Sequence, residues 1–188
     1  MPAGTRFARQ IAISFAMILG GILIARAIAP FDDPPKYELS NSTGAIATNE
    51  NLTGRRLAQV DLVATSGENI STESLLGKPL ILNVWYSTCE PCRRELPVLA
   101  AAAKANAGLV RFVGVNIKDS AGVASEFASN YGVQYDLLLD PLGEFISASR
   151  IGTVPMTLAV DADGIVVDQV AGEISAERLN ELIAKLVK

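Results

Sequence analysis

The pattern of apolar and polar positions changes twice along the chain. An apolar run from Ile11 to Ala25 is followed by residues 31–56, where apolar positions are scattered and show no period. From Leu57 onward, short apolar runs bounded by turn residues alternate with longer segments whose apolar residues recur at helical spacing. This alternation predicts an α/β domain over residues 57–188, preceded by a linker (31–56) and a separate N-terminal segment (1–30).

One strand of this domain stands out. Pro79 to Tyr86 contains a continuous apolar run, which suits a central strand buried on both faces. Further strands are expected at 60–64, near residue 70, and at 110–116, 135–139, 156–160 and 165–170. The strands at 60–64 and near residue 70 are expected to pair as a hairpin, and so are those at 156–160 and 165–170. Helices are expected at 90–107, 121–130, 145–149 and 175–188, the last of them capped by Ser175.

The N-terminal segment has the features of a membrane-targeting sequence. Arg6 and Arg9 precede the apolar run, as a charged n-region precedes an h-region. Residues 27–29 have the small-x-small form of a cleavage site, so a secreted protein is one outcome. We expect retention as a single-pass anchor instead, because Pro30 would follow the cut and the run approaches the roughly 17 to 25 residues of a spanning helix. With the positive residues Arg6 and Arg9 on the cytoplasmic side and acidic residues 32–33 after the run, the domain is expected on the extracytoplasmic side of a bacterial membrane.

Composition narrows the chemistry of the domain. The 188 residues carry a formal net charge of -4 and include no histidine and two cysteines. Because the net charge is negative, the chain has no basic stripe of the kind that binds the phosphates of a nucleic acid. Without histidine the chain cannot build Ser-His-Asp triads, Cys-His nucleophiles or His-containing metal sites. We therefore expect no nucleic-acid partner, metal or cofactor, and the chemistry falls to the cysteines.

The two cysteines lie at the junction of the 79–86 strand and the helix that follows it. Unpaired N–H groups at a helix N-terminus stabilise a thiolate, so Cys89 is the expected nucleophile. Cys92 is one helical turn further on and can attack a mixed disulfide on Cys89. Pro91 falls in the first turn, where its missing N–H costs little. A structural disulfide and half of a zinc site are the alternatives. The loop that a Cys89–Cys92 disulfide closes is so short that it would remove little entropy from the unfolded chain, and no further Cys or His is present to complete a zinc site.

Two longer motifs around these residues resemble one family. Residues 85–97 run Trp-Tyr-Ser-Thr-Cys-Glu-Pro-Cys-Arg-Arg-Glu-Leu-Pro, and residues 152–161 run Gly-Thr-Val-Pro-Met-Thr-Leu-Ala-Val-Asp. Both are similar to the membrane-anchored thioredoxin-like proteins of the TlpA, ResA and CcmG type, over roughly residues 57–188. The resemblance implies a thioredoxin-like fold: a central mixed β-sheet flanked by helices, an N-terminal hairpin, and an extra strand and helix inserted within residues 116–143.

The resemblance also implies roles around the cysteine pair. It implies a redox-active Cys89–Cys92 disulfide faced by a cis Val154–Pro155 peptide, whose neighbouring backbone groups can pair with a substrate strand. A trans proline that opens a strand is the alternative. Trp85 would pack beside the pair and help to bind substrate, although a plain core aromatic has the same place in sequence. Glu95 would be a functional acid that tunes the cysteines, although a solvated helix charge has the same spacing.

Two positions depart from the family pattern. Asn83 stands where thioredoxins proper carry a buried Asp, so proton transfer would rely on Glu95 or on water. Thr88 stands where many relatives carry Trp, just before the first cysteine, so one wall of the active-site surface is smaller.

The resulting hypothesis is an extracytoplasmic thiol-disulfide oxidoreductase that reduces protein disulfides. The family implies apocytochrome c as substrate and a membrane electron donor resembling the DsbD or CcdA proteins. A disulfide oxidase for secreted proteins and a copper(I)-binding module remain as alternatives. A peroxidase is disfavoured, because Leu82 and Tyr86 stand where the peroxiredoxin motif requires Pro and Thr.

Overall fold

The computed structural model of the protein describes residues 48–188. The expected signal or anchor segment (1–30) and residues 31–47 of the expected linker lie outside the described residues. Within residues 48–188, no helix combines the length and the apolar character that crossing a membrane requires.

A seven-stranded mixed sheet forms the centre of the described domain. Its order is β2-β1-β5-β4-β3-β6-β7. The strands are β1 (Asp61–Ala64), β2 (Asn69–Ser71), β3 (Leu80–Trp85), β4 (Arg111–Asn116), β5 (Asp136–Leu139), β6 (Met156–Val160) and β7 (Val166–Ala171). Strands β3, β4 and β5 are parallel, whereas β6 runs antiparallel to β3. The expected hairpins β1–β2 and β6–β7 are both present.

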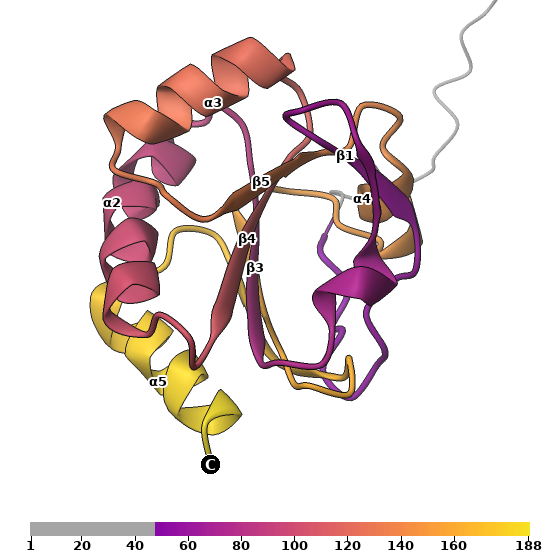
Figure 1. The fold of residues 1–188 in the computed structure, drawn as a ribbon. Coiled ribbons are helices and arrows are strands. Elements are labelled where there is room, and N and C mark those ends of the chain that lie inside the picture. Colours follow the sequence, from indigo (N-terminus) through magenta and orange to yellow (C-terminus); the bar gives the residue numbers. More distant parts are fainter. Residues whose placement is uncertain (1–47) are drawn as a thin grey trace, which may run out of the picture. The chain divides into compact units, whose positions relative to one another are not determined.

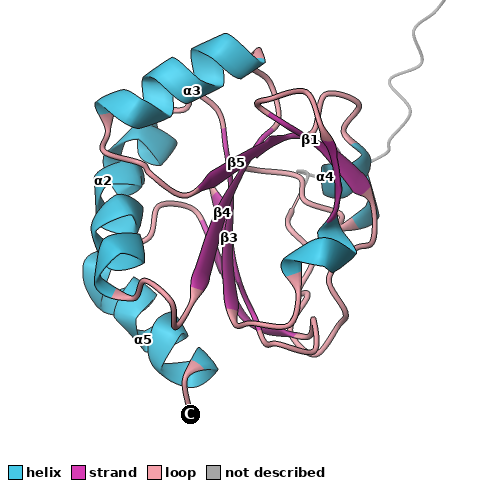
Figure 2. Ribbon diagram, viewed as in Figure 1, coloured by secondary structure: helices cyan, strands magenta, loops and turns pink. Residues whose placement is uncertain are grey.

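Helices cover the two faces of the sheet unequally (Figure 1). The helices α2 (Glu90–Ala105), α3 (Ala121–Asn130) and α5 (Ala176–Leu186) lie on one side. The short helix α4 (Glu144–Ala148) and the 3-10 helix η1 (Thr72–Leu75) lie on the other, as the colouring by secondary structure also shows (Figure 2). This is the thioredoxin-like α/β arrangement that the resemblance implied.

Strand β3 is buried over its whole length because both of its faces meet a hydrophobic core. Leu80, Leu82 and Val84 pack in the core on the α4 side. Ile81 and Trp85 point to the other face and pack in the cores beneath α2, α3 and α5. The continuous apolar run of this segment therefore reflects a central strand, as expected.

Helix α5 follows the predicted pattern closely. The Ser175 hydroxyl accepts a hydrogen bond from the Arg178 N–H at 3.2 Å and caps the helix N-terminus. The buried residues of the helix all lie on one face: Leu179, Leu182, Ile183 and Leu186. This face packs with Ile81 and Phe112 of the sheet.

The contacts of the domain extend towards the N-terminus beyond residue 57. Leu52 and Leu57 are buried in the core on the α4 side. The Gly54 N–H donates to the Val166 carbonyl, and the Val166 N–H donates to the Arg55 carbonyl, each at 2.8 Å. Residues 52–57 are thus held against the start of β7.

Candidate active site

The cysteine pair lies where β3 passes into α2. Cys89 occupies the N-cap position of α2, and its Sγ accepts a hydrogen bond from the Cys92 N–H at 3.3 Å. The two sulfur atoms form a disulfide. Pro91 lies in the first turn of the helix, where no intrahelical N–H bond is required. The strand-to-helix position predicted for the pair is therefore the observed one.

The two cysteines differ in accessibility. Cys89 is 5% exposed, whereas Cys92 is fully buried beneath it. Both belong to a core cluster with Trp85, Leu96 and residues of α3. An incoming sulfur atom can therefore reach Cys89 before it can reach Cys92.

Glu95 is buried one turn after Cys92, which excludes a solvated helix charge. The Asn83 Nδ2 donates to its Oε1 at 2.7 Å, and the Ile174 N–H donates to its Oε2 at 3.0 Å. Burial raises the pKa of Glu95 to about 7, with a smaller contribution from nearby Glu173, while the two hydrogen bonds act in the opposite direction. At neutral pH this carboxyl group can therefore both take up and release a proton.

Asn83 orients the Glu95 carboxyl group and cannot take its place in proton transfer. Its amide nitrogen also donates to the Thr157 Oγ1 at 3.1 Å, so the amide is held between β3, β6 and α2. An amide does not titrate, so Asn83 cannot carry the proton itself. Of the Asn83 and Glu95 side chains, only that of Glu95 can exchange a proton.

The Val154–Pro155 peptide is cis, as the resemblance implied. It directly precedes β6, whose first residue Met156 is paired with Val84 near the end of β3. Val154 packs against the core cluster that contains Cys89 and Cys92. The loop that carries the cis proline therefore lies at the same end of the sheet as the disulfide.

Trp85 supports the pair from within the core. It is fully buried, belongs to the same cluster as both cysteines, and stacks on Phe127 of α3 at a centroid distance of 5.9 Å. The described domain leaves no exposed surface of Trp85 for a substrate to contact, so its side chain packs as a core aromatic rather than in the expected substrate-binding position.

Comparison with known proteins identifies the family of this fold and site. Residues 53–169 match the AhpC/TSA family. The chain belongs to this family. Its relatives include the thiol-disulfide oxidoreductase ResA of Bacillus subtilis, which is 30% identical over 118 residues. That alignment covers 62% of this chain and 66% of ResA, so the chain spans just under two thirds of that relative.

Solved structures similar to this AhpC/TSA protein include a disulfide oxidoreductase. MTB dsbF, determined in mixed oxidized and reduced forms, has 32% identity and a TM-score of 0.63, with 68% of this chain and 95% of that chain covered. A secreted Mycobacterium tuberculosis disulfide oxidoreductase homologous to E. coli DsbE has 29% identity and the same TM-score, with 68% and 96% covered. These likenesses confirm the predicted thioredoxin-like oxidoreductase class and the ResA-type resemblance.

One polar cluster beside the cysteine pair was not predicted from the sequence. Asp119 accepts hydrogen bonds from the Ser87 N–H and hydroxyl at 2.7 Å each, and from the Asn116 Nδ2 at 2.8 Å. Burial acts to raise the pKa of Asp119, but the bonds from Asn116 and Ser87 outweigh it and lower the pKa below its usual value. Asp119 thereby fixes the turn before Cys89. No short motif links positions 32 residues apart, so this contact had no sequence signal.

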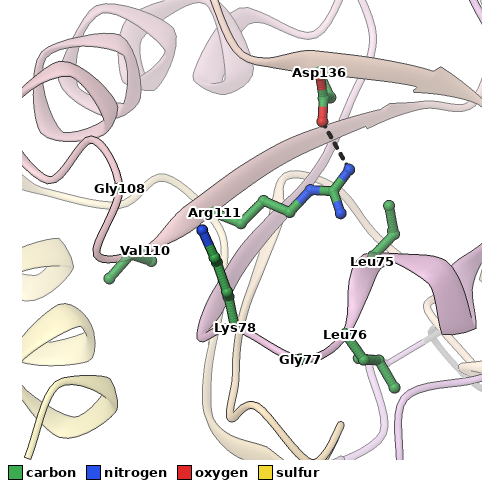
Figure 3. Close-up of a pocket in the computed structure, with 8 residues that line it drawn as sticks. All are labelled: Leu75, Leu76, Gly77, Lys78, Gly108, Val110, Arg111 and Asp136. Carbon is green, nitrogen blue, oxygen red and sulfur yellow. Dashed lines mark hydrogen bonds and ion pairs between the residues drawn. The ribbon is translucent and has the colours of Figure 1, made fainter.

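A separate hollow of about 580 Å³ lies away from this site in the AhpC/TSA domain (Figure 3). Leu75, Lys78 and Arg111 line it, and Arg111 forms an ion pair with Asp136 at 2.9 Å. Arg111 begins β4 and Lys78 shortly precedes β3, so the hollow lies at the opposite ends of these strands from the cysteines. It contains none of the predicted site residues.

Proposed function

We propose that this chain is an extracytoplasmic thiol-disulfide reductase that acts on protein disulfides. The observation that carries the proposal is the arrangement along one helix: Cys89 at its N-terminus, Cys92 buried below, and the buried acid Glu95 one turn further on. The oxidoreductase class of the relatives supports the same chemistry.

The reaction begins with both cysteines reduced. The Cys89 thiolate, stabilised by the N–H groups at the start of α2, attacks one sulfur of a substrate disulfide. The substrate S–S bond breaks, one substrate sulfur leaves as a thiolate and takes up a proton, and a mixed disulfide to Cys89 forms.

Cys92 then resolves the mixed disulfide. Its thiol loses a proton to ionised Glu95, and the resulting thiolate attacks the Cys89 Sγ. The second substrate sulfur leaves and is protonated, and the Cys89–Cys92 disulfide forms. The substrate has gained two electrons and two protons: the cysteine pair supplies both electrons and, through Glu95, the proton for the second leaving sulfur, while solvent supplies the proton for the first.

The surroundings of Cys92 support the reducing direction of electron flow. A strong oxidant such as DsbA stabilises its reduced form as a thiolate. Here burial and a carboxyl group on the same helix face disfavour negative charge on Cys92. This environment favours a reducing pair over an oxidising one.

The resemblance to the ResA-type family supports a proposal for the substrate and for the electron source. We propose that an extended substrate segment pairs with the backbone of Val154 beside Pro155. Apocytochrome c, with its haem-attachment cysteines, is the proposed substrate, and a membrane dithiol donor of the DsbD or CcdA type is the proposed reductant. The N-terminal anchor would hold the domain close to this donor.

A trapping experiment tests the activity. A Cys92→Ala variant cannot resolve, so it should accumulate mixed disulfides through Cys89 with its substrates, whereas Cys89→Ala is the matched control and should accumulate fewer. If Cys92→Ala traps no more protein than the control, the oxidoreductase function is wrong.

The reduction potential tests the direction. We expect a value close to that of thioredoxin, about -270 mV, when the pair is equilibrated with a dithiol buffer. A value near that of DsbA, about -120 mV, would instead identify a disulfide oxidase.

A further inference from the structure

The side chain of Asn49 holds the loop that carries the cis proline. Its Oδ1 accepts hydrogen bonds from the Gly152 and Thr153 N–H groups, both at 2.8 Å. Its Nδ2 donates to the Thr153 carbonyl and to the Thr153 Oγ1, both at 3.0 Å. Two N–H donors face one end of the amide and a carbonyl faces the other, so its orientation is determined by its partners.

The loop depends on such contacts because it has no regular secondary structure. Residues 149–155 connect α4 to β6, so their backbone groups lack the partners that a helix or a sheet supplies. Asn49 satisfies three backbone groups, at Gly152 and Thr153, with one side chain. The Glu50 N–H adds a bond to the Arg150 carbonyl at 3.3 Å. The segment that leads into the domain is therefore joined to the loop beside the disulfide.

Thr153 is separated from Pro155 only by Val154. We propose that Asn49 is a positioning residue for substrate: by fixing Gly152 and Thr153, it holds the Val154 backbone ready to pair with an extended polypeptide. This inference rests on the proposed function. A loop that is already ordered does not lose that conformational freedom when substrate binds, so polypeptide affinity is higher.

The effect should be selective for polypeptide substrates. A small aromatic disulfide reacts at Cys89 without pairing along the loop, so its rate reports only on the thiolate. Loss of the Asn49 contacts should therefore weaken the binding of a protein disulfide and leave the reaction with the small disulfide unchanged. A general loss of folding would instead affect both.

The test compares Asn49→Ala with Asn51→Ala in the full-length chain. Asn51 lies in the same segment, and its side chain accepts one bond from the Thr53 N–H at 3.0 Å, so it is the matched control. Each reduced protein is mixed with insulin or with dithionitrobenzoate in single turnovers. Oxidation is followed by the fluorescence of Trp85, the one tryptophan of the sequence, or by the released thiol.

For Asn49→Ala, the half-saturating insulin concentration should rise about threefold to tenfold, as expected for losing hydrogen bonds that order the loop. The maximal rate and the dithionitrobenzoate rate should stay within about twofold of wild type, since attack by Cys89 does not use the loop. Asn49→Asp keeps the two accepted bonds and should lie between Asn49→Ala and wild type.

Equal losses with both substrates, or an unchanged insulin affinity in Asn49→Ala, would overturn this inference. Failure of the wild-type chain to reduce insulin at all would overturn the proposed function instead, so the two failures are distinguishable.

Discussion

At the scale of single residues, the contacts of Glu95 decide whether its carboxyl group is a buried acid or a solvated charge. Sequence spacing placed Glu95 on the same helix face as Cys92, and a solvated charge has that spacing too. The distinction required contacts from distant segments, the Asn83 amide on β3 and the Ile174 N–H before α5. Cys89 and Cys92 were predictable because their chemistry needs only a strand-to-helix junction, which the local pattern shows.

The raised pKa of Glu95 predicts how stability depends on pH. Folding raises this pKa from 4.5 to about 7, so the folded state binds more protons than the unfolded chain between these values. The contribution of Glu95 to the stability of the folded state is therefore fully present below about pH 4.5 and is lost as pH rises to about 7. The loss amounts to roughly 3 kcal/mol in the free energy of unfolding.

Glu95→Gln should remove this part of the pH dependence and make the oxidised protein more stable than wild type at pH 8. Denaturant unfolding between pH 5 and pH 8 measures it. Glu90→Gln alters an exposed side chain of the same helix and should keep the wild-type slope. A slope in Glu95→Gln that equals the wild-type slope would contradict the assignment.

At the scale of elements, the sequence predicted most helices and strands because turn residues separate them. Helix α3 and strand β6 have the expected bounds, and the other expected elements differ from the structure by only a few residues. The helix η1 was missed, since four residues are too few to show a helical period. The position of β5 between β1 and β4 depends on tertiary packing, which no local pattern encodes.

The serine N-caps of the α-helices α3 and α5 predict a difference between these two helices. Ser175 bonds to the Arg178 N–H of α5, whereas Ser120, at the N-cap of α3, makes no such side-chain bond within the described residues. Ser175→Ala should lower the free energy of unfolding by about 1 kcal/mol.

Ser120→Ala is the control and should change stability by less than about 0.5 kcal/mol. Thermal or denaturant unfolding of the two variants measures the difference. Similar effects at both serines would show that the bond to Arg178 contributes little.

At the scale of the whole domain, strand order predicts where the fold opens first. Strand β3 is fully buried with strands on both sides, whereas β2 is a three-residue strand at the edge of the sheet. Amide groups in buried central strands exchange with solvent only in large-scale unfolding, while edge strands open locally.

Hydrogen exchange followed by mass spectrometry should therefore show the slowest exchange in peptides that cover 80–85 and much faster exchange in those that cover 69–71. Strand β7 lies at the opposite edge but is six residues long and pairs with β6 at five of them, so its exchange should lie between the two. Exchange in β3 as fast as in β2 would contradict the central role of β3.

The contacts of residues 49–57 have a practical consequence for shortened versions of the protein. A chain trimmed to start at residue 57, where the periodic pattern begins, would lack Leu52 from the core and the Asn49 amide beside Thr153. Such a fragment could retain the disulfide and still misreport the protein's affinity for its substrates. Soluble fragments intended for biochemical work should begin before Asn49.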